Sequence, residues 1–195
     1  GMMNSPLGAS GNAGAMAGVN DSLRQKGIPP VITTDGPSGI RLRATCSLLP
    51  SGTALACSWN LPLVQDLYAA MGREMVDKGT DVLLAPGMNI HRHPLNGRNF
   101  EYFSEDSLLS GAMASNEIAG AKSKGVYSFM KHFALNDQET NRTNMVCTWA
   151  NEQSIRETYL KPFEMSVKEG GAQAVMSSFN YIGYTYAGAS SNLLQ

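Results

Sequence analysis

Short runs of apolar and β-branched residues recur along the chain, and each run predicts a buried strand. Four such runs occupy residues 30–34, 82–85, 126–130 and 174–177. One of the stretches between them shows helical periodicity. An apolar residue recurs every fourth position at Leu63, Leu67, Met71 and Met75, which predicts a helix with one apolar stripe ending before Gly79.

Two further helices are predicted, the first of them from its cap. One begins after a cap at Ser104 or Asp106 and runs to about residue 124, and another covers about residues 152–168. The first 27 residues are rich in Gly, Ala, Ser and Asn, so residues 1–27 are interpreted as a loop-rich lead-in with a short helix at 21–26. Strands that alternate with helices indicate parallel βαβ units.

The long connections follow the strand ends, where the loops of a (β/α)8 barrel build the active site. A doubly wound sheet is the alternative, but no glycine-rich turn of the dinucleotide-binding kind follows Thr34, Ala85 or Met130. We therefore expect an α/β fold: a partial (β/α)8 TIM-type barrel with parallel strands. Residues 1–195 form a single, incomplete domain in this interpretation, because a whole barrel needs eight strands and about 250 residues.

Composition excludes several function classes. A formal net charge of -1 gives no reason to expect nucleic acid or membrane partners. No run approaches the roughly 20 apolar residues that span a bilayer, and no secretory leader is visible. Gly1 before Met2 and Met3 is typical of an expression-tag remnant, so the native start and any signal on it are expected to be missing.

Three cysteines, Cys46, Cys57 and Cys147, make an odd number without a CxxC pair. This pattern favours buried free thiols over a disulfide framework or a zinc site. It fits a reducing compartment, and we expect a cytoplasmic protein.

Polar side chains gather directly after the predicted strands. Asp35 follows the first strand in the sequence DGPSGIR, residues 35–41. Its carboxylate can accept hydrogen bonds from two neighbouring hydroxyls, the arrangement that a sugar diol offers, and Arg41 can pair with it and keep it ionised. A turn-forming aspartate is the structural alternative.

Residues 86–106 follow the second strand and are loop-like, aromatic and dense in hydrogen-bonding groups, as in a carbohydrate site. Glu101 and Glu105 could be acid/base residues if seen alone, but we interpret them as partners of arginines or as helix caps. His91 and His93 suggest a metal, yet with His132 they exhaust the histidines, so no metal is expected.

The third group, KHFALNDQETNR at residues 131–142, follows an apolar strand. Adjacent residues of a strand point to opposite faces, so Lys131 and His132 reach one pocket only through a bulge or a cis peptide. The fourth group, MSSFN at residues 176–180, offers an apolar wall beside polar groups at another strand end.

The motifs DGPSGIR, NIHRHPLNGRNFEYFSED, KHFALNDQETNR and VMSSFN, in this order, resemble the N-terminal barrel of glycoside hydrolase family 3, over roughly residues 5–195. The resemblance implies a retaining O-glycosyl hydrolase of the β-glucosidase type, acting on β-linked glucosides or related sugars without a cofactor. KHF followed by NDQETNR favours this branch over the N-acetylglucosaminidases.

The resemblance also implies which residues bind substrate. It assigns distal sugar hydroxyls to an aspartate, adjacent hydroxyls to a Lys-His pair, and the walls of the subsite to arginines and one apolar contact. The implied substrate-binding residues are Asp35, Arg41, Arg98, Lys131, His132, Arg142, Met176 and Phe179. Phe179 departs from the family, since many members carry a tyrosine there whose hydroxyl bonds to the nucleophile.

No catalytic residue is expected in this chain. The family's nucleophile is an aspartate in a Ser/Thr-Asp-Trp-like motif, and neither Trp59 nor Trp149 follows an aspartate, so we expect it beyond Gln195. The acid/base residue usually comes from the following domain, and the first strand of the family is expected upstream of this chain. We therefore expect the chain alone to be inactive, with its open strand edges covered by self-association or by the missing remainder of the enzyme.

Two other classes of protein are alternatives to a hydrolase. A non-catalytic sugar-binding or regulatory protein from a truncated gene stays open as the alternative. A phosphate-binding barrel with a cofactor is disfavoured, because Gly183 and Gly188 are too isolated to form a phosphate loop.

Overall fold

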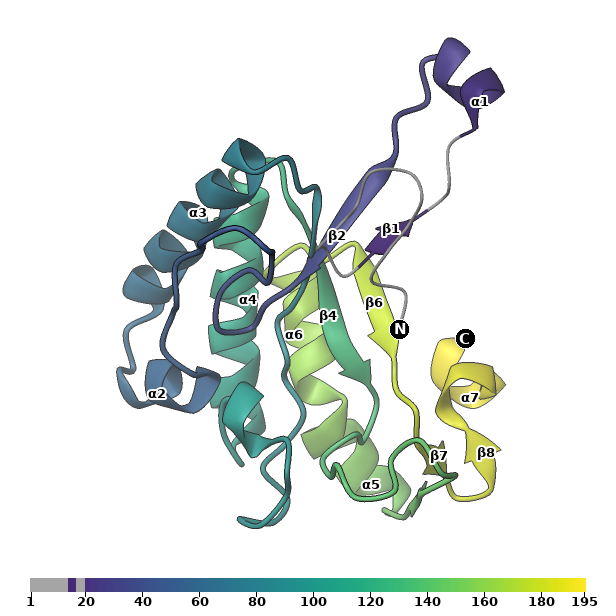
Figure 1. Cartoon of the computed structure of the whole chain (residues 1–195). Helices are drawn as coiled ribbons and strands as arrows, with labels where there is room; N and C mark the ends of the chain where they lie inside the picture. Colours follow the sequence, from purple (N-terminus) through teal and green to yellow (C-terminus); the bar gives the residue numbers. More distant parts are fainter. Residues whose placement is uncertain (1–13, 17–19) are drawn as a thin grey trace.

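The computed structural model describes residues 14–16 and 20–195 (Figure 1). Most of the predicted lead-in, residues 1–13 and 17–19, lies outside the described residues. The part that is described contains a short strand that was not predicted, β1 (Gly14–Met16), and the expected short helix, α1 (Asp21–Gln25).

The main sheet has five strands in the order β1-β2-β3-β4-β6. The four predicted strands are present as β2 (Val31–Asp35), β3 (Val82–Leu84), β4 (Tyr127–Phe133) and β6 (Ala174–Ser177). Each is parallel to the next, and β1 pairs antiparallel with β2.

This order confirms the predicted fold class. The parallel strands follow one another in chain order without the reversal that a doubly wound sheet has at its switch point. The helices α3 (Leu61–Asp77), α4 (Ser107–Lys122) and α6 (Lys161–Lys168) lie side by side against the sheet, with α4 in the middle (Figure 1). The fold is therefore a partial barrel wall, and within the described residues the sheet does not close.

Two polar caps start the longer helices. The Asn60 side chain accepts from the backbone N–H of Leu63 at the start of α3, and Asp106, not Ser104, accepts from Leu109 at 2.8 Å at the start of α4. None of the described helices is long and apolar enough to cross a membrane.

The single helix expected over residues 152–168 is wrong in detail. The segment is broken into α5 (Glu152–Ser154), a π-helical turn η2 (Ile155–Tyr159) and α6. Pro162, in the first turn of α6, has no N–H to donate to the preceding turn, so the helical hydrogen bonds start again there.

Several short elements carry too few residues for a periodic signal and were not predicted. They are the helical turns α2 (Gly52–Cys57), η1 (Asn99–Glu101), η3 (Ala187–Ala189) and α7 (Ser191–Leu194), and a second sheet of β5 (Cys147–Thr148), β7 (Tyr181–Ile182) and β8 (Thr185–Tyr186).

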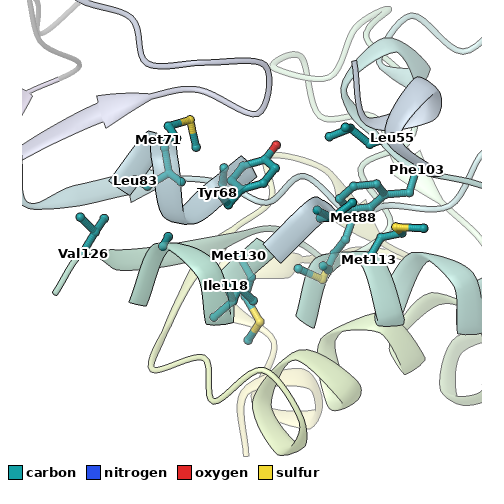
Figure 2. Packing of buried hydrophobic residues seen from close by; sticks show 14 of the residues in the cluster. Leu55, Tyr68, Met71, Leu83, Met88, Phe103, Met113, Ile118, Val126 and Met130 are labelled. Carbon is teal, nitrogen blue, oxygen red and sulfur yellow. The ribbon is translucent and has the colours of Figure 1, made fainter. Parts of the chain in front are cut away.

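The core fills the space between the sheet and the helix layer and is rich in methionine (Figure 2). The buried stripe of α3 is Val64, Tyr68, Met71 and Met75, so the predicted stripe is shifted at its start, where Leu63 faces solvent. Flexible thioether side chains adapt to irregular gaps between helices and strands, which suits this layer.

The prediction of buried thiols is wrong. Cys57 and Cys147 are exposed, and Cys46 is partly covered; all three are free. Cys57 ends the short helix α2, which buries Leu55 and Ala56 in the core but leaves Cys57 on its outer side, and Cys147 is the exposed residue of the two-residue strand β5.

Candidate functional site

Four charged side chains from successive βα units meet at the carboxyl ends of the parallel strands. Asp35 is the last residue of β2, Lys131 lies near the end of β4, and Glu101 comes from η1 after β3. The Lys131 ammonium donates to Asp35 Oδ1 at 2.7 Å and lies 3.9 Å from Glu101 Oε2. Arg41 lies farther away, with its guanidinium 3.6 Å from Asp35 Oδ2.

These contacts decide the charge of Asp35. Burial alone would raise the pKa of the carboxyl, but the charge and hydrogen bond of Lys131, aided by Arg41 and the Gly36 N–H, hold that pKa below its usual value. Asp35 is therefore ionised at neutral pH, and about a third of its side chain (34%) remains exposed. The predicted Arg41–Asp35 pair is present, and Lys131 is the nearer partner.

The loop after Asp35 is held by one hydrogen bond within its own backbone and by another from helix α3. Arg41 N–H donates to the Asp35 carbonyl at 3.0 Å, and the Tyr68 hydroxyl donates to the Pro37 carbonyl at 2.6 Å. Gly39 has a φ of +114°, and a Cβ there would meet the Ser47 carbonyl oxygen at 2.3 Å. Glycine is required at this position, because a side chain would push the loop away from the segment that covers it.

Arg98 joins the second and third sequence motifs. Its guanidinium donates to Glu101 from Nε, at 2.6 Å, and from a terminal nitrogen, and it donates to Glu139 Oε2 at 3.1 Å. The Nε of Arg142 lies 2.6 Å from the same Glu139 oxygen. The interpretation of Glu101 as an arginine partner is confirmed, whereas Glu105 is exposed and leaves the cap of α4 to Asp106.

The hydrogen bonds of His132 define its protonation. The Tyr102 hydroxyl donates its only proton to the Asn136 carbonyl at 2.8 Å, so His132 Nδ1, 3.0 Å away, is the donor to the Tyr102 oxygen. This leaves Nε2 as an acceptor for Arg98, at 3.3 Å. Burial, together with the charges of Lys131, Arg98 and Arg142, lowers the pKa of His132 to about 2, so the ring is neutral.

The backbone between Lys131 and His132 is irregular, as their neighbouring positions require. The peptide bond that joins them is cis, and the pairing of β4 with β6 shifts register between Lys131 and Phe133. Asn89 pairs with this peptide: its side-chain amide donates to the His132 carbonyl at 3.0 Å and accepts from the His132 N–H at 2.9 Å. Lys131 and His132 are only 3% and 5% exposed.

Asn89 and Tyr102 are supporting residues that sequence reasoning did not single out. Both lie in the polar segment 86–106, but no spacing distinguishes them from its other members. The two histidines of that segment, His91 and His93, have local contacts: His91 Nε2 lies 3.0 Å from the Asn99 carbonyl oxygen, and His93 Nδ1 accepts from Leu95 N–H.

The wall on the β6 side is apolar. Met176 pairs in register with Lys131 and is partly exposed. Phe179 follows β6, is half exposed, and lies under the Arg142 guanidinium, whose central carbon is 5.0 Å from the ring centroid. The structure thus brings all eight predicted binding residues to the carboxyl-end edge of one sheet.

The site alternates negative and positive groups around an open edge. Asp35, Glu101 and Glu139 are acceptors, each beside a lysine or arginine, and the arginines present several donors. Such a surface can bind a neutral molecule rich in hydroxyl groups, since each hydroxyl both donates and accepts.

Comparison with known proteins agrees with this chemistry. The model of the glycosyl hydrolase family 3 N-terminal domain matches residues 11–195. A β-glucosidase from Ruminococcus albus is 45% identical over 193 residues, which is 98% of this chain and 20% of the relative. Thermostable β-glucosidase B from Acetivibrio thermocellus is 42% identical over 88% of this chain and 24% of its own length.

Solved structures show the same fold. β-Glucosidase 3B from Thermotoga neapolitana, in complex with α-D-glucose, has a TM-score of 0.90 and 42% identity, covering 96% of this chain and 27% of that one. A β-glucosidase from Paenibacillus barengoltzii has a TM-score of 0.85 and 49% identity, over 91% of this chain and 19% of its own. The chain thus spans about a fifth to a quarter of the relatives that it matches. On its sequence, its fold and the order of its motifs, this chain belongs to glycosyl hydrolase family 3.

Proposed function

We propose that the charged cluster is the glycone subsite of a retaining β-glucosidase acting on β-linked glucosides or related sugars. The observation that carries this proposal is the state of Asp35: a carboxylate kept ionised by Lys131, with one side still open to solvent beside Arg41. An ionised carboxylate in that position accepts two hydroxyl hydrogen bonds at once.

The other groups complete the subsite. Arg98 and Arg142 present donors next to Glu139, and the neutral ring of His132 lies against Arg98. Met176 and Phe179 supply the apolar wall against which the nonpolar face of a sugar ring packs. With phenylalanine at 179, no hydroxyl is available there to bond to a nucleophile.

We further propose that these residues hold the sugar and do not react with it. A retaining glycosidase needs two carboxylates about 5 to 5.5 Å apart, one of them free to attack the anomeric carbon. The carboxylates Asp35, Glu101 and Glu139 each lie beside a cation that stabilises the charge and reduces nucleophilicity. The nucleophile and the acid/base residue then come from polypeptide outside residues 1–195, which we regard as one incomplete domain.

The direct test is a titration with gluconolactone or glucose followed by calorimetry. Asp35→Ala is expected to abolish measurable binding, whereas Asp66→Ala, an exposed aspartate on α3, is expected to bind as the unchanged protein does. Binding that survives in Asp35→Ala would remove the proposed subsite.

Activity is a separate prediction. The purified 195-residue chain is expected to release no nitrophenol from a nitrophenyl β-glucoside above the uncatalysed rate, because covalent and acid/base steps both lack their carboxylate. The whole natural polypeptide that contains this sequence is expected to turn the substrate over. If that polypeptide binds gluconolactone but is inactive, the alternative, a sugar-binding or regulatory protein, replaces the hydrolase.

For location, we propose the cytoplasm. The three cysteines are free and two are exposed, which suits a reducing compartment. Labelling of thiols in intact cells with permeant and impermeant reagents would test this.

A further inference from the structure

Glu117 is a buried acid whose charge would interact with that of Lys131 in the charged cluster. It lies in the middle of α4, is 1% exposed, and its Oε1 has no hydrogen-bond partner. Its neighbour is Tyr68 of α3, which is completely buried within the core (Figure 2). A carboxyl group in such a place is costly unless it has a specific partner.

The hydrogen bonds around Tyr68 define which group carries the proton. The Tyr68 hydroxyl has one hydrogen, and it donates that hydrogen to the Pro37 carbonyl at 2.6 Å. A hydrogen bond between the Glu117 carboxyl and the Tyr68 oxygen therefore needs a proton on Glu117. Consistently, burial raises the pKa of Glu117 well above its usual value, despite the opposing effects of Tyr68 and Lys131.

This chain of donors ends on the loop that carries Asp35. Pro37 lies two residues after Asp35, and the loop is tied to the strand end by the bond from Arg41 N–H to the Asp35 carbonyl. The Pro37 carbonyl, held by Tyr68, and the Asp35 backbone are therefore parts of one hydrogen-bonded loop.

We propose that Glu117 is a positioning residue of the sugar subsite, which donates to Tyr68 and through it holds the Pro37 carbonyl and the loop that presents Asp35. This inference rests on the proposed function of that subsite. A neutral acid suits the task better than an anion, since a second negative charge near Lys131 would compete with Asp35 for it.

The test compares gluconolactone binding in the whole natural polypeptide with Glu117→Gln, Glu117→Leu and Tyr68→Phe. Glutamine keeps the shape and a donor, so its dissociation constant is expected to stay within about twofold. Glu117→Leu removes the donor to Tyr68, and Tyr68→Phe removes the donor to the Pro37 carbonyl. Each variant is expected to weaken binding roughly tenfold, as the loss of one hydrogen bond does. The Glu117→Leu/Tyr68→Phe double variant is expected to lose no more than either single one, because both act along one path.

Thermal unfolding of each variant separates this role from general destabilisation. If Glu117→Leu does not fold, Tyr68→Phe decides, because it removes one oxygen atom only. Normal binding by a folded Tyr68→Phe or Glu117→Leu variant overturns the inference, and so does Glu117→Gln binding as weakly as leucine. A lack of gluconolactone binding by the unchanged protein overturns the proposed function itself, and the inference with it.

Discussion

Lys131 and Arg41 both lie beside the Asp35 carboxylate, but they differ in burial. Lys131 is almost completely covered and donates directly, whereas Arg41 is 68% exposed and stands 3.6 Å away. Solvent screens an exposed pair, so its contribution is small, while a covered charge acts at a lower effective dielectric. The electrostatic state of the site therefore depends on Lys131.

We predict that Lys131→Met raises the pKa of Asp35 above its ordinary value, since burial then acts without its main opposing charge. Arg41→Ala is the matched control and is expected to move that pKa much less, because the Arg41 side chain is exposed. Titration of the carboxyl carbon by NMR measures both. The folded-state pKa is lowered, so Asp35 stabilises the unchanged protein above about pH 4 and that stability is lost as the pH falls below it. Equal shifts in the two variants would contradict this assignment.

At this scale the sequence predicts the residues that end strands better than the residues behind them. Asp35 and Lys131 can be found because parallel strands bring their carboxyl ends to one edge. Asn89, Tyr102 and Glu117 cannot, because a buried partner depends on the register and depth of segments far apart in the chain.

Among the elements, α3 and α4 cross with their backbones in close approach at Gly120. A Cβ on Gly120 would meet the backbone oxygen of Gln65 at 2.3 Å and the backbone nitrogen of Ala69 at 3.0 Å. Gly111, on the same helix, faces the flexible side chain of Met165 instead. The two glycines therefore compare a backbone obstacle at Gly120 with a mainly side-chain obstacle at Gly111, where the Met165 sulfur lies nearest, at 2.5 Å, and its Cβ lies at 3.1 Å.

We predict that Gly120→Ala lowers the free energy of unfolding by about 3 kcal/mol or more, because two helix backbones must separate. Gly111→Ala is expected to cost at most about 1 kcal/mol, since Met165 can change rotamer and alanine favours the helix. Urea unfolding of both variants measures the difference. A similar decrease in the free energy of unfolding of the two variants would mean that α3 and α4 move apart as easily as a methionine side chain changes rotamer.

Long periodic helices were predicted well and interrupted ones were not. The apolar stripe of α3 persists over the four positions Leu63, Leu67, Met71 and Met75, which a sequence window resolves, and α4 has a polar cap residue at Asp106 to mark its start. In residues 152–168 the same apolar periodicity continues through a π-helical turn, whose altered hydrogen bonding leaves no mark on the pattern of side chains.

For the whole molecule, an uncovered apolar groove lies where the sheet stops. Strand β6 is the edge strand of the main sheet. Val175 on β6 and Val167 on α6 are 41% and 50% exposed there. The other apolar residues that line the groove include Met130, Phe133 and Phe163. The relatives are four to five times longer than this chain, and we infer that the groove is covered when such further polypeptide is present.

We therefore predict that the isolated 195-residue chain associates with itself through this groove. Light scattering is expected to show a mass above that of the monomer. Val175→Lys is expected to reduce that mass, because a charge on the edge strand opposes its pairing with a second chain. Leu95→Lys, which alters an exposed apolar residue that does not line the groove, serves as the control and is expected to have no effect. A monomeric mass for the unchanged chain in light scattering would contradict the prediction.

The overall architecture was predictable because strand and helix alternate in a regular order, and parallel βαβ units admit few topologies. The small sheet of β5, β7 and β8 was not, because two-residue strands pair only where tertiary contacts bring them together.

The ion pair of Asp35 and Lys131 joins β2 to β4, two strands that are not neighbours in the sheet, since β3 lies between them. The two side chains therefore meet only after three strands have aligned in the correct register. A carbodiimide, which condenses a carboxylate and an ammonium in direct contact, would turn this pair into an amide bond. The 35–131 cross-linked peptide, detected by mass spectrometry, would thus report on the assembly of the sheet without any substrate.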